Sequence, residues 1–189
     1  MQRLLIVGAG SHGRSVAEAV VSQNVYKLVG FVDDGYVAGA SVFEWPVLGV
    51  AASLPNLKAQ ADCVLVAIGN NAVREKWVAS ALAAGFALAT LVHPRAFVSP
   101  SAVVGAGTAI MAGAMVGTEA RLGVASIVNA GAVVDHHAVV EDFGHLGTSA
   151  CMAGGALLGR GAWMQAGSAL GYGVKVAAGA VLLPGQGQM

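Results

Sequence analysis

The chain has 189 residues, with ten Lys and Arg, ten Asp and Glu, and charged residues at only 11% of its positions. Phosphate binding needs a concentrated basic surface, so this composition excludes nucleic acid as a partner. Apolar residues make up 56% of the chain but form no uninterrupted run long enough for a transmembrane helix, which excludes a membrane-spanning protein, and we expect a cytoplasmic one.

The first half of the chain alternates apolar runs with helical patterns. Leu4 to Val7 is continuously apolar, which is typical of a central parallel strand buried on both faces. The pattern predicts further elements in the order helix, strand, strand, helix and strand, at residues 14–23, 27–32, 62–68, 72–84 and 87–92. The segment with Pro46 and Pro55 is expected to be a loop. We therefore predict a small Rossmann-like α/β domain with a parallel sheet over residues 1–93.

A glycine-rich loop lies between the first strand and the first helix. Its sequence over residues 8–13 is Gly-Ala-Gly-Ser-His-Gly, and Asp33 ends the next strand twenty positions after Gly13. Backbone N–H groups at the start of a helix favour an anion. The motif alone suggests NAD or FAD, but about ninety residues supply barely half of a dinucleotide-binding domain, so a nucleotide-linked small molecule fits better.

The residues expected to hold this molecule follow the carboxyl ends of the strands: Gly10, Ser11, His12, Asp33, Asp34 and Gly69. A purely structural interpretation is also open, in which the glycines only allow a tight turn between strand and helix. His12 argues against it, because a tight turn has no need of an imidazole.

From Val98 to Leu182 the chain is apolar at every sixth position, without exception. The position four further on is nearly always small, and the position three further on is often glycine. A helical face returns every three to four residues and a strand face every two, so a strict period of six indicates a parallel β-helix of hexapeptide repeats. Three hexads make one coil, so residues eighteen apart stack about 4.8 Å from each other. We predict four to five coils in a second domain, residues 94–189.

One dense polar cluster interrupts the hexads and consists of Asn129, Asp135, His136, His137, Glu141, Asp142 and His145. His136 and Gly154 are eighteen residues apart, which would set an imidazole beside a glycine backbone, a pairing suited to a general base and an oxyanion-stabilising N–H. Asp135, His137 and Asp142 are the candidates for orienting the His136 ring. His145 is one and a half faces further round the coil, so its contact with the same site requires a neighbouring subunit.

Two other interpretations of this cluster are open. One is metal binding, but the spacing of the three histidines matches no common zinc signature, and we expect no metal. The other is a solvated polar turn on a non-catalytic scaffold. Independently, Met111, Met115 and Trp163 would leave an apolar flank exposed on so slim a solenoid, which favours threefold self-association.

Five motifs, in this order, resemble the PglD and NeuD family of bacterial sugar acetyltransferases: Gly8–Gly13, Phe31–Asp34, Ala67–Asn71, Leu91–Pro94 and Asn129–His136. The resemblance implies a left-handed β-helix, a homotrimer with active sites between subunits, acetyl-CoA as donor and a nucleotide-linked amino sugar as acceptor. It further implies that His136 is the catalytic base and that the Gly154 N–H faces the thioester oxygen. It places His145, Ala166 and Ala178 at the acetyl-CoA channel, and the sugar pocket at Gly10, Ser11, His12, Asp33, Asp34 and Gly69. We also expect Asp135 and His137 at the catalytic site and Asn129 among the substrate-binding residues.

One departure from the family is His137, which stands where the family often has Glu or Asp directly after the catalytic histidine. The expected reaction is direct acetyl transfer to a sugar amine without a covalent acetyl-enzyme. O-acetylation of a sialic acid or another sugar hydroxyl and a catalytically silent hexapeptide scaffold are the alternatives.

Overall fold

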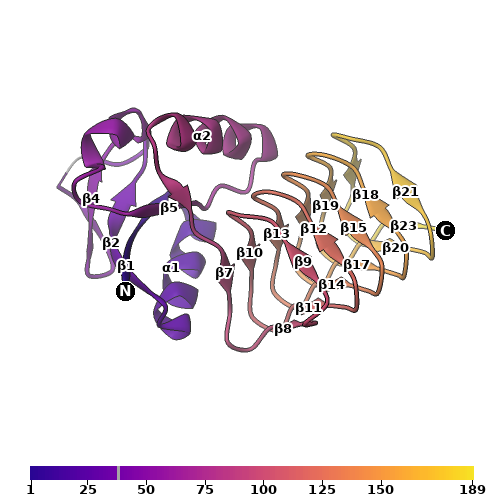
Figure 1. The fold of residues 1–189 in the computed structure, drawn as a ribbon. Coiled ribbons are helices and arrows are strands. Elements are labelled where there is room, and N and C mark those ends of the chain that lie inside the picture. The colour runs from indigo at the N-terminus through magenta and orange to yellow at the C-terminus, as the bar shows by residue number, and fades with distance from the viewer. Residues whose placement is uncertain (38) are drawn as a thin grey trace. The chain divides into compact units, whose positions relative to one another are not determined.

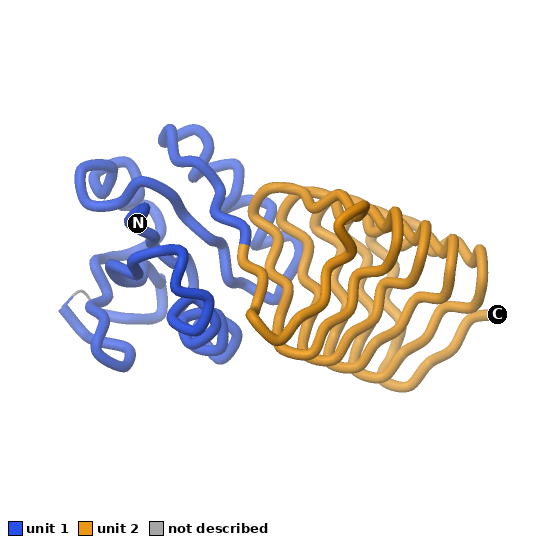
Figure 2. The backbone as a smooth tube through the Cα atoms, turned by 60° about the horizontal axis from the view of Figure 1, so that its bottom comes forward, with its two compact units in different colours: residues 1–90 blue, residues 91–189 orange. Residues whose placement is uncertain are grey.

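The structure is a computed structural model that describes residues 1–37 and 39–189. The chain divides into two compact units, Met1–Thr90 and Leu91–Met189, which are coloured separately in Figure 2. The expected fold class, a Rossmann-like sheet followed by a left-handed parallel β-helix, is confirmed. Among the described residues, no helix is both long enough and apolar enough to cross a membrane.

The first unit is built on one six-stranded sheet with the order β3-β4-β2-β1-β5-β6. Its strands are β1 (Gln2–Val7), β2 (Tyr26–Val32), β3 (Ser41–Val42), β4 (Trp45–Gly49), β5 (Cys63–Val66) and β6 (Ala87–Leu88). All pairings are parallel except that of β3 with β4. The apolar run of β1 is fully buried because β1 lies centrally, between β2 and β5.

Two helices, α1 (Ser11–Gln23) and α2 (Asn71–Ala83), connect parallel strands of this sheet. The chain leaves β1 toward β2 in one direction and leaves β5 toward β6 in the other, so right-handed crossovers set α1 and α2 on opposite faces (Figure 1). The strand order therefore reverses between β1 and β5. A crevice at the carboxyl ends of such strands is the usual ligand site of this architecture.

Two predictions for this unit were wrong. The expected loop contains β3, β4 and a 3₁₀-helix, η1 (Ala51–Leu57), and Pro46 and Pro55 hid them because proline is depleted in strands and helices. The expected last strand is two strands, since β6 pairs with β5 in the first unit and Leu91–Val92 is the first strand of the solenoid. The first unit thus ends at Thr90, three residues before the predicted domain boundary at residue 93.

The second unit is a solenoid of short parallel strands in three sheets (Figure 1). Its strands are β7 (Leu91–Val92), β8 (Phe97–Val98), β9 (Val103–Val104), β10 (Ala109–Ile110), β11 (Met115–Val116), β12 (Arg121–Leu122), β13 (Ile127–Val128), β14 (Val133–Val134), β15 (Val139–Val140), β16 (His145–Leu146), β17 (Cys151–Met152), β18 (Leu157–Leu158), β19 (Trp163–Met164), β20 (Ala169–Leu170), β21 (Lys175–Val176), β22 (Val181–Leu182) and β23 (Gly187–Gln188).

The eighteen-residue register follows the predicted period, as in Met115↔Val133 and Val133↔Cys151. From β10 to β22 the second residue of each strand points inward, and these residues form most of the core of the unit. The expected four to five coils are too few, because β7 and β23 extend the repeat at both ends to between five and six. The outward flank also differs from expectation, since Met111 is buried while Met115 is exposed.

Candidate functional site

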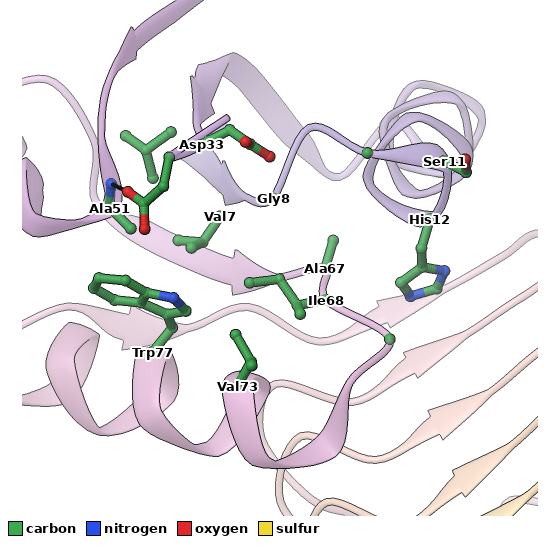
Figure 3. Close-up of a pocket in the computed structure, with 14 residues that line it drawn as sticks. Val7, Gly8, Ser11, His12, Asp33, Ala51, Ala67, Ile68, Val73 and Trp77 are labelled. Carbon is green, nitrogen blue, oxygen red and sulfur yellow. Dashed lines mark hydrogen bonds between the residues drawn. The ribbon is translucent and has the colours of Figure 1, made fainter. Parts of the chain in front are cut away.

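A cleft of about 370 Å³ lies in the first unit at the carboxyl ends of β1, β2 and β5 (Figure 3). The lining includes all six residues predicted for the nucleotide-linked ligand: Gly10, Ser11, His12, Asp33, Asp34 and Gly69. Ala51, Val73 and Trp77 also line it, and sequence reasoning missed them. In Figure 3 the Trp77 indole lies near Val7 and Ala51, whereas His12 lies at the other end of the cleft, beyond Ala67.

Glycine is required at two positions of the loop below this cleft. Gly8 has φ of 103°, and a Cβ there would lie 2.9 Å from the Ala67 carbonyl oxygen. A Cβ on Gly13 would collide with the Gly8 carbonyl, so glycine at this position lets α1 begin directly against the strand. The backbone N–H groups of the first turn of α1 consequently face the cleft, where an anionic group is favoured.

The two aspartates of the cleft have different surroundings. Asp33 accepts hydrogen bonds from the backbone N–H groups of Ala9, at 2.6 Å, and Gly35, at 2.7 Å, so it ties the glycine loop to the end of β2. Asp34 is exposed and accepts one from the Ala51 N–H at 2.8 Å. Its second carboxylate oxygen has no hydrogen-bond partner in the described part of the chain. Asp34 is therefore the carboxylate with an oxygen left for a ligand.

His12 is a neutral imidazole at ordinary pH. Burial and, to a smaller extent, the positive charge of Arg74 together lower its pKa to about 4. The Nε2 atom is buried without a hydrogen-bond partner among the described residues. Buried polar atoms are normally paired, so this nitrogen is available to a group that enters the cleft.

Arg74 fixes the loop that follows β5 and was not found from the sequence. Its side chain is completely buried and donates to the carbonyls of Ile68, at 2.9 Å, and Gly69, at 3.3 Å, and to Asn71 Oδ1 at 2.8 Å. Burial lowers the pKa of its guanidinium to about 10, which leaves it charged at neutral pH. Asn70 caps α2 by accepting from the Val73 N–H at 3.0 Å. This wall of the cleft is therefore held by side chains.

In the second unit, His136 and Gly154 lie together as predicted. His136 follows β14 and Gly154 follows β17, and the two strands pair with Val134 opposite Met152. A Cβ on Gly154 would lie 2.5 Å from His136 Nε2, so only glycine leaves room for the imidazole. The neighbouring N–H of Gly155 donates to the His136 carbonyl at 3.0 Å. Among the described residues, the Gly154 N–H donates to no acceptor, which leaves this donor beside the ring.

Of the three candidates for orienting His136, only His137 contacts its ring in a hydrogen-bonding geometry. The two Nδ1 atoms are 3.0 Å apart. Asp135 accepts from the backbone N–H of His136 at 2.7 Å, but its Oδ2 lies 3.9 Å from His136 Nε2, beyond hydrogen-bonding distance. Asp142 lies at another corner of the coil, where it accepts from the Val124 N–H and from Arg160, each at 2.8 Å.

A carboxylate that sequence reasoning missed completes this arrangement. Glu119 Oε2 lies 3.0 Å from His137 Nε2. Glu119 precedes His137 by eighteen residues, so the register that pairs His136 with Gly154 also stacks Glu119 and His137. The eighteen-residue period of the coil is the sequence signal that could have identified Glu119.

Other predicted site residues lie elsewhere on the same protomer. His145 is in β16, on a different sheet, where its buried ring stacks on Trp163 with centroids 5.4 Å apart. Ala166 and Ala178 follow β19 and β21 and are exposed at two further corners. Asn129 follows β13, accepts from the Ala130 N–H at 2.8 Å, and does not line the cleft of the first unit. A single protomer therefore does not bring His145, Ala166 and Ala178 to His136.

Two comparisons by sequence connect the chain with sugar-modifying enzymes. The family model described as the PglD N-terminal domain matches residues 3–81. UDP-N-acetylbacillosamine N-acetyltransferase of Bacillus subtilis (strain 168) is 34% identical over 102 residues. That match covers 52% of this chain and 46% of the relative, so it spans about half the length of either protein.

Comparison with solved structures extends the similarity over almost the whole chain. A mutant of perosamine N-acetyltransferase from Caulobacter crescentus, in complex with CoA and GDP-perosamine, has a TM-score of 0.89 and 32% identity, covering 99% of this chain and 91% of that one. The acetyltransferase domain of PglB from Neisseria gonorrhoeae FA1090, in complex with acetyl coenzyme A, has a TM-score of 0.80 and 35% identity, covering 98% and 93%.

Proposed function

The chain belongs to the PglD/NeuD family of bacterial sugar acetyltransferases, and from this premise we propose that it transfers the acetyl group of acetyl-CoA to the amino group of a nucleotide-linked amino sugar. The observation that carries the proposal is the position of the His136 imidazole against the Gly154 backbone. A base beside an unpaired N–H is what attack on a thioester needs, because one group removes a proton and the other stabilises the oxyanion.

The proposed reaction is a direct transfer. The acceptor amine attacks the thioester carbonyl, His136 Nε2 takes its proton, and the Gly154 N–H donates to the oxyanion that forms. Collapse of this intermediate breaks the carbon–sulfur bond, and the CoA thiolate recovers a proton from His136. A C–N bond has then replaced the C–S bond, and no acetylated side chain is formed.

The cleft of the first unit is the proposed site of the nucleotide. Its glycine loop and the start of α1 favour the phosphates, and the Trp77 indole at the far end offers an apolar face for a base. Asp34 retains an oxygen for a donor on the base or the ribose, and the neutral His12 has Nε2 available to the sugar. Relatives crystallised with GDP-perosamine support a ligand of this class.

We further propose a homotrimer with active sites between subunits. The outward column of one solenoid sheet consists of Phe97, Met115, Val133, Cys151, Ala169 and Gly187 and has no charged side chain. Phe97 and Met115 are 57% and 42% exposed in the single chain, so association would remove apolar surface from water. Such an assembly would let His145, Ala166 and Ala178 of one subunit approach His136 of the next. We place the reaction in the cytoplasm, which fits the two free thiols, Cys63 and Cys151.

The test combines calorimetry with a free-thiol assay. Titration with acetyl-CoA should give saturable binding, whereas a catalytically silent scaffold should not bind it. Release of CoA thiol is then measured with a panel of nucleotide amino sugars and with the matching nucleotide sugars that have a hydroxyl in place of the amine. Thiol release with the amines alone is the expected result. Release with the hydroxyl sugars alone would replace N-acetylation by O-acetylation.

A further inference from the structure

We propose that Glu119 and His137 are positioning residues that fix the tautomer of His136 and strengthen it as a base. This inference rests on the proposed function, because it assigns a role in the same acetyl transfer. Neither residue needs to touch the substrates. Glu119 acts on His137, and His137 acts on His136.

The side chains of Glu119, His137 and His136 form a hydrogen-bonded triad across two coils. Glu119 Oε2 lies 3.0 Å from His137 Nε2, and His137 Nδ1 lies 3.0 Å from His136 Nδ1. The two imidazole planes are inclined at 84°, so the rings meet edge to face and do not stack. The His136 ring turns its Cε1 edge toward Gly154, because a Cβ there would come nearest to Cε1 and would lie 2.5 Å from Nε2 and 3.0 Å from Nδ1. Since Nδ1 contacts His137, Nε2 is the nitrogen left to take the proton of the amine.

The donor and acceptor capacities of the three groups determine which atoms of the triad carry protons. An ionised carboxylate only accepts, so the proton on a neutral His137 must lie on Nε2, facing Glu119. The Nδ1 of His137 then presents a lone pair, and the Nδ1 of His136 must donate to it. His136 is left with its lone pair on Nε2, as a general base requires. A proton that later arrives at Nε2 is stabilised through His137 by the negative charge of Glu119.

Both positioning residues stand in left-handed turns of the solenoid. Glu119 and His137 have φ of 56° and 60°, a conformation that disfavours side chains. At the same turn position in the next two coils the chain has Gly155 and Gly173. Ala125, Phe143 and Ser149 share this conformation at other turns, so what distinguishes Glu119 and His137 is that their side chains bond to each other.

Two other charged residues lie beside this triad. Arg121 lines a hollow of about 190 Å³ together with Glu119 and His137, and Asp135 Oδ2 lies 3.9 Å from His136 Nε2. Ser101 Oγ, in the same hollow, accepts from the Glu119 backbone N–H at 3.0 Å and so holds the turn. An arginine stays charged throughout the pH range in which histidine titrates. Any change of activity with pH in that range therefore has to come from the histidine pair or a carboxylate.

The experiment compares Glu119→Gln with the intact protein by the pH dependence of kcat/KM. The variant keeps the size of the side chain and removes its charge. We expect kcat to fall roughly 10- to 100-fold, which is part of the general-base contribution, with KM values unchanged. We also expect the acidic limb of the profile to move to lower pH, because the variant lacks the negative charge that favours a protonated histidine.

A second variant and a control separate this role from a structural one. Glu119→Gln combined with His137→Glu returns a carboxylate directly to the side of His136 and should recover activity relative to Glu119→Gln alone. Glu18→Gln, the same change at an exposed position on α1, should leave both kcat and the acidic limb unchanged. Loss of activity in Glu119→Gln with no shift of the limb and no recovery in the double variant would overturn the proposal.

The same assay distinguishes failure of this inference from failure of the proposed function. His136→Ala has to reduce turnover for the proposed base to stand. If it does so while Glu119→Gln matches the intact protein at every pH, only the role of Glu119 and His137 is wrong. If His136→Ala leaves turnover intact, the assignment of His136 as the base is wrong and the triad has another role.

Discussion

The imidazole of His136 occupies the space that a side chain on Gly154 would take, although the two residues lie on successive coils. The solenoid sets this relationship by its register, and both residues stand in turns and do not belong to the hydrophobic core of the solenoid. A change at either residue therefore tests the site with little disturbance of the core.

Gly154→Ala should lower activity and stability together. The new Cβ would displace the His136 ring, and because this ring is half-exposed and can rotate, the displacement should cost only about 0.5–1.5 kcal/mol. In a His136→Ala background the methyl group has room, so most of the loss of Tm should disappear. Thermal melts of the four proteins in this cycle measure the coupling. Equal Tm losses in both backgrounds would contradict the contact between the two residues.

Arg74→Met should weaken the binding of the nucleotide sugar and leave acetyl-CoA binding unchanged. Loss of the guanidinium leaves the carbonyls of Ile68 and Gly69 without their donor, at a cost of about 1–3 kcal/mol, and loosens the wall of the cleft. Calorimetry with each ligand separates the two effects. Lys27→Met, at an exposed position on β2, is the control, and equal weakening of both ligands in Arg74→Met would contradict a local role.

His12 should make the stability of the protein depend on pH. Its pKa is about 4 in the folded protein and about 6.5 when unfolded, so between these values the unfolded chain binds the extra proton. The free energy of unfolding should therefore be highest above pH 6.5 and fall toward pH 4, by at most about 3 kcal/mol. Urea melts at pH 4.5 and 7.5 measure this. His12→Gln should flatten the dependence, and an unaltered dependence in that variant would count against the assignment.

Met115→Asp should dissociate the proposed trimer and abolish activity. The substitution places a charge in the outward column of apolar residues that the subunits would cover. Sedimentation velocity should show a trimer for the intact protein and a monomer for the variant. Val25→Asp, at an exposed apolar position outside the solenoid, should stay trimeric and active. A monomeric intact protein with full activity would refute sites shared between subunits.

The fold could be predicted to a large extent because its signals are periodic. The six-residue repeat specifies which residue of each strand is buried, and the buried stack from Ile110 to Leu182 follows it. Predictions failed where tertiary pairing overrides local preference. Pro46 lies within β4, beside the two-residue strand β3. Leu91 begins the solenoid, although in sequence it continues the apolar run that contains β6 of the first unit.

The site could be predicted where the register relates residues directly, as for His136 and Gly154. Glu119 was missed because it lies one coil before the polar cluster, isolated in sequence between Thr118 and Ala120. Asp142 was an expected partner of His136 because it is close in sequence, but the coil turns a corner between them and Arg160 binds it instead. Arg74 and Trp77 gave no signal, since their roles arise from the packing of α2 against the cleft.

The most direct test of the account is turnover by His136→Ala, measured as CoA thiol release with a nucleotide amino sugar that the intact protein acetylates. We predict a loss of roughly 100- to 10,000-fold, the usual size of a general-base contribution, with acetyl-CoA binding and the oligomeric state unchanged. Turnover equal to that of the intact protein would contradict the assignment of His136 as the base.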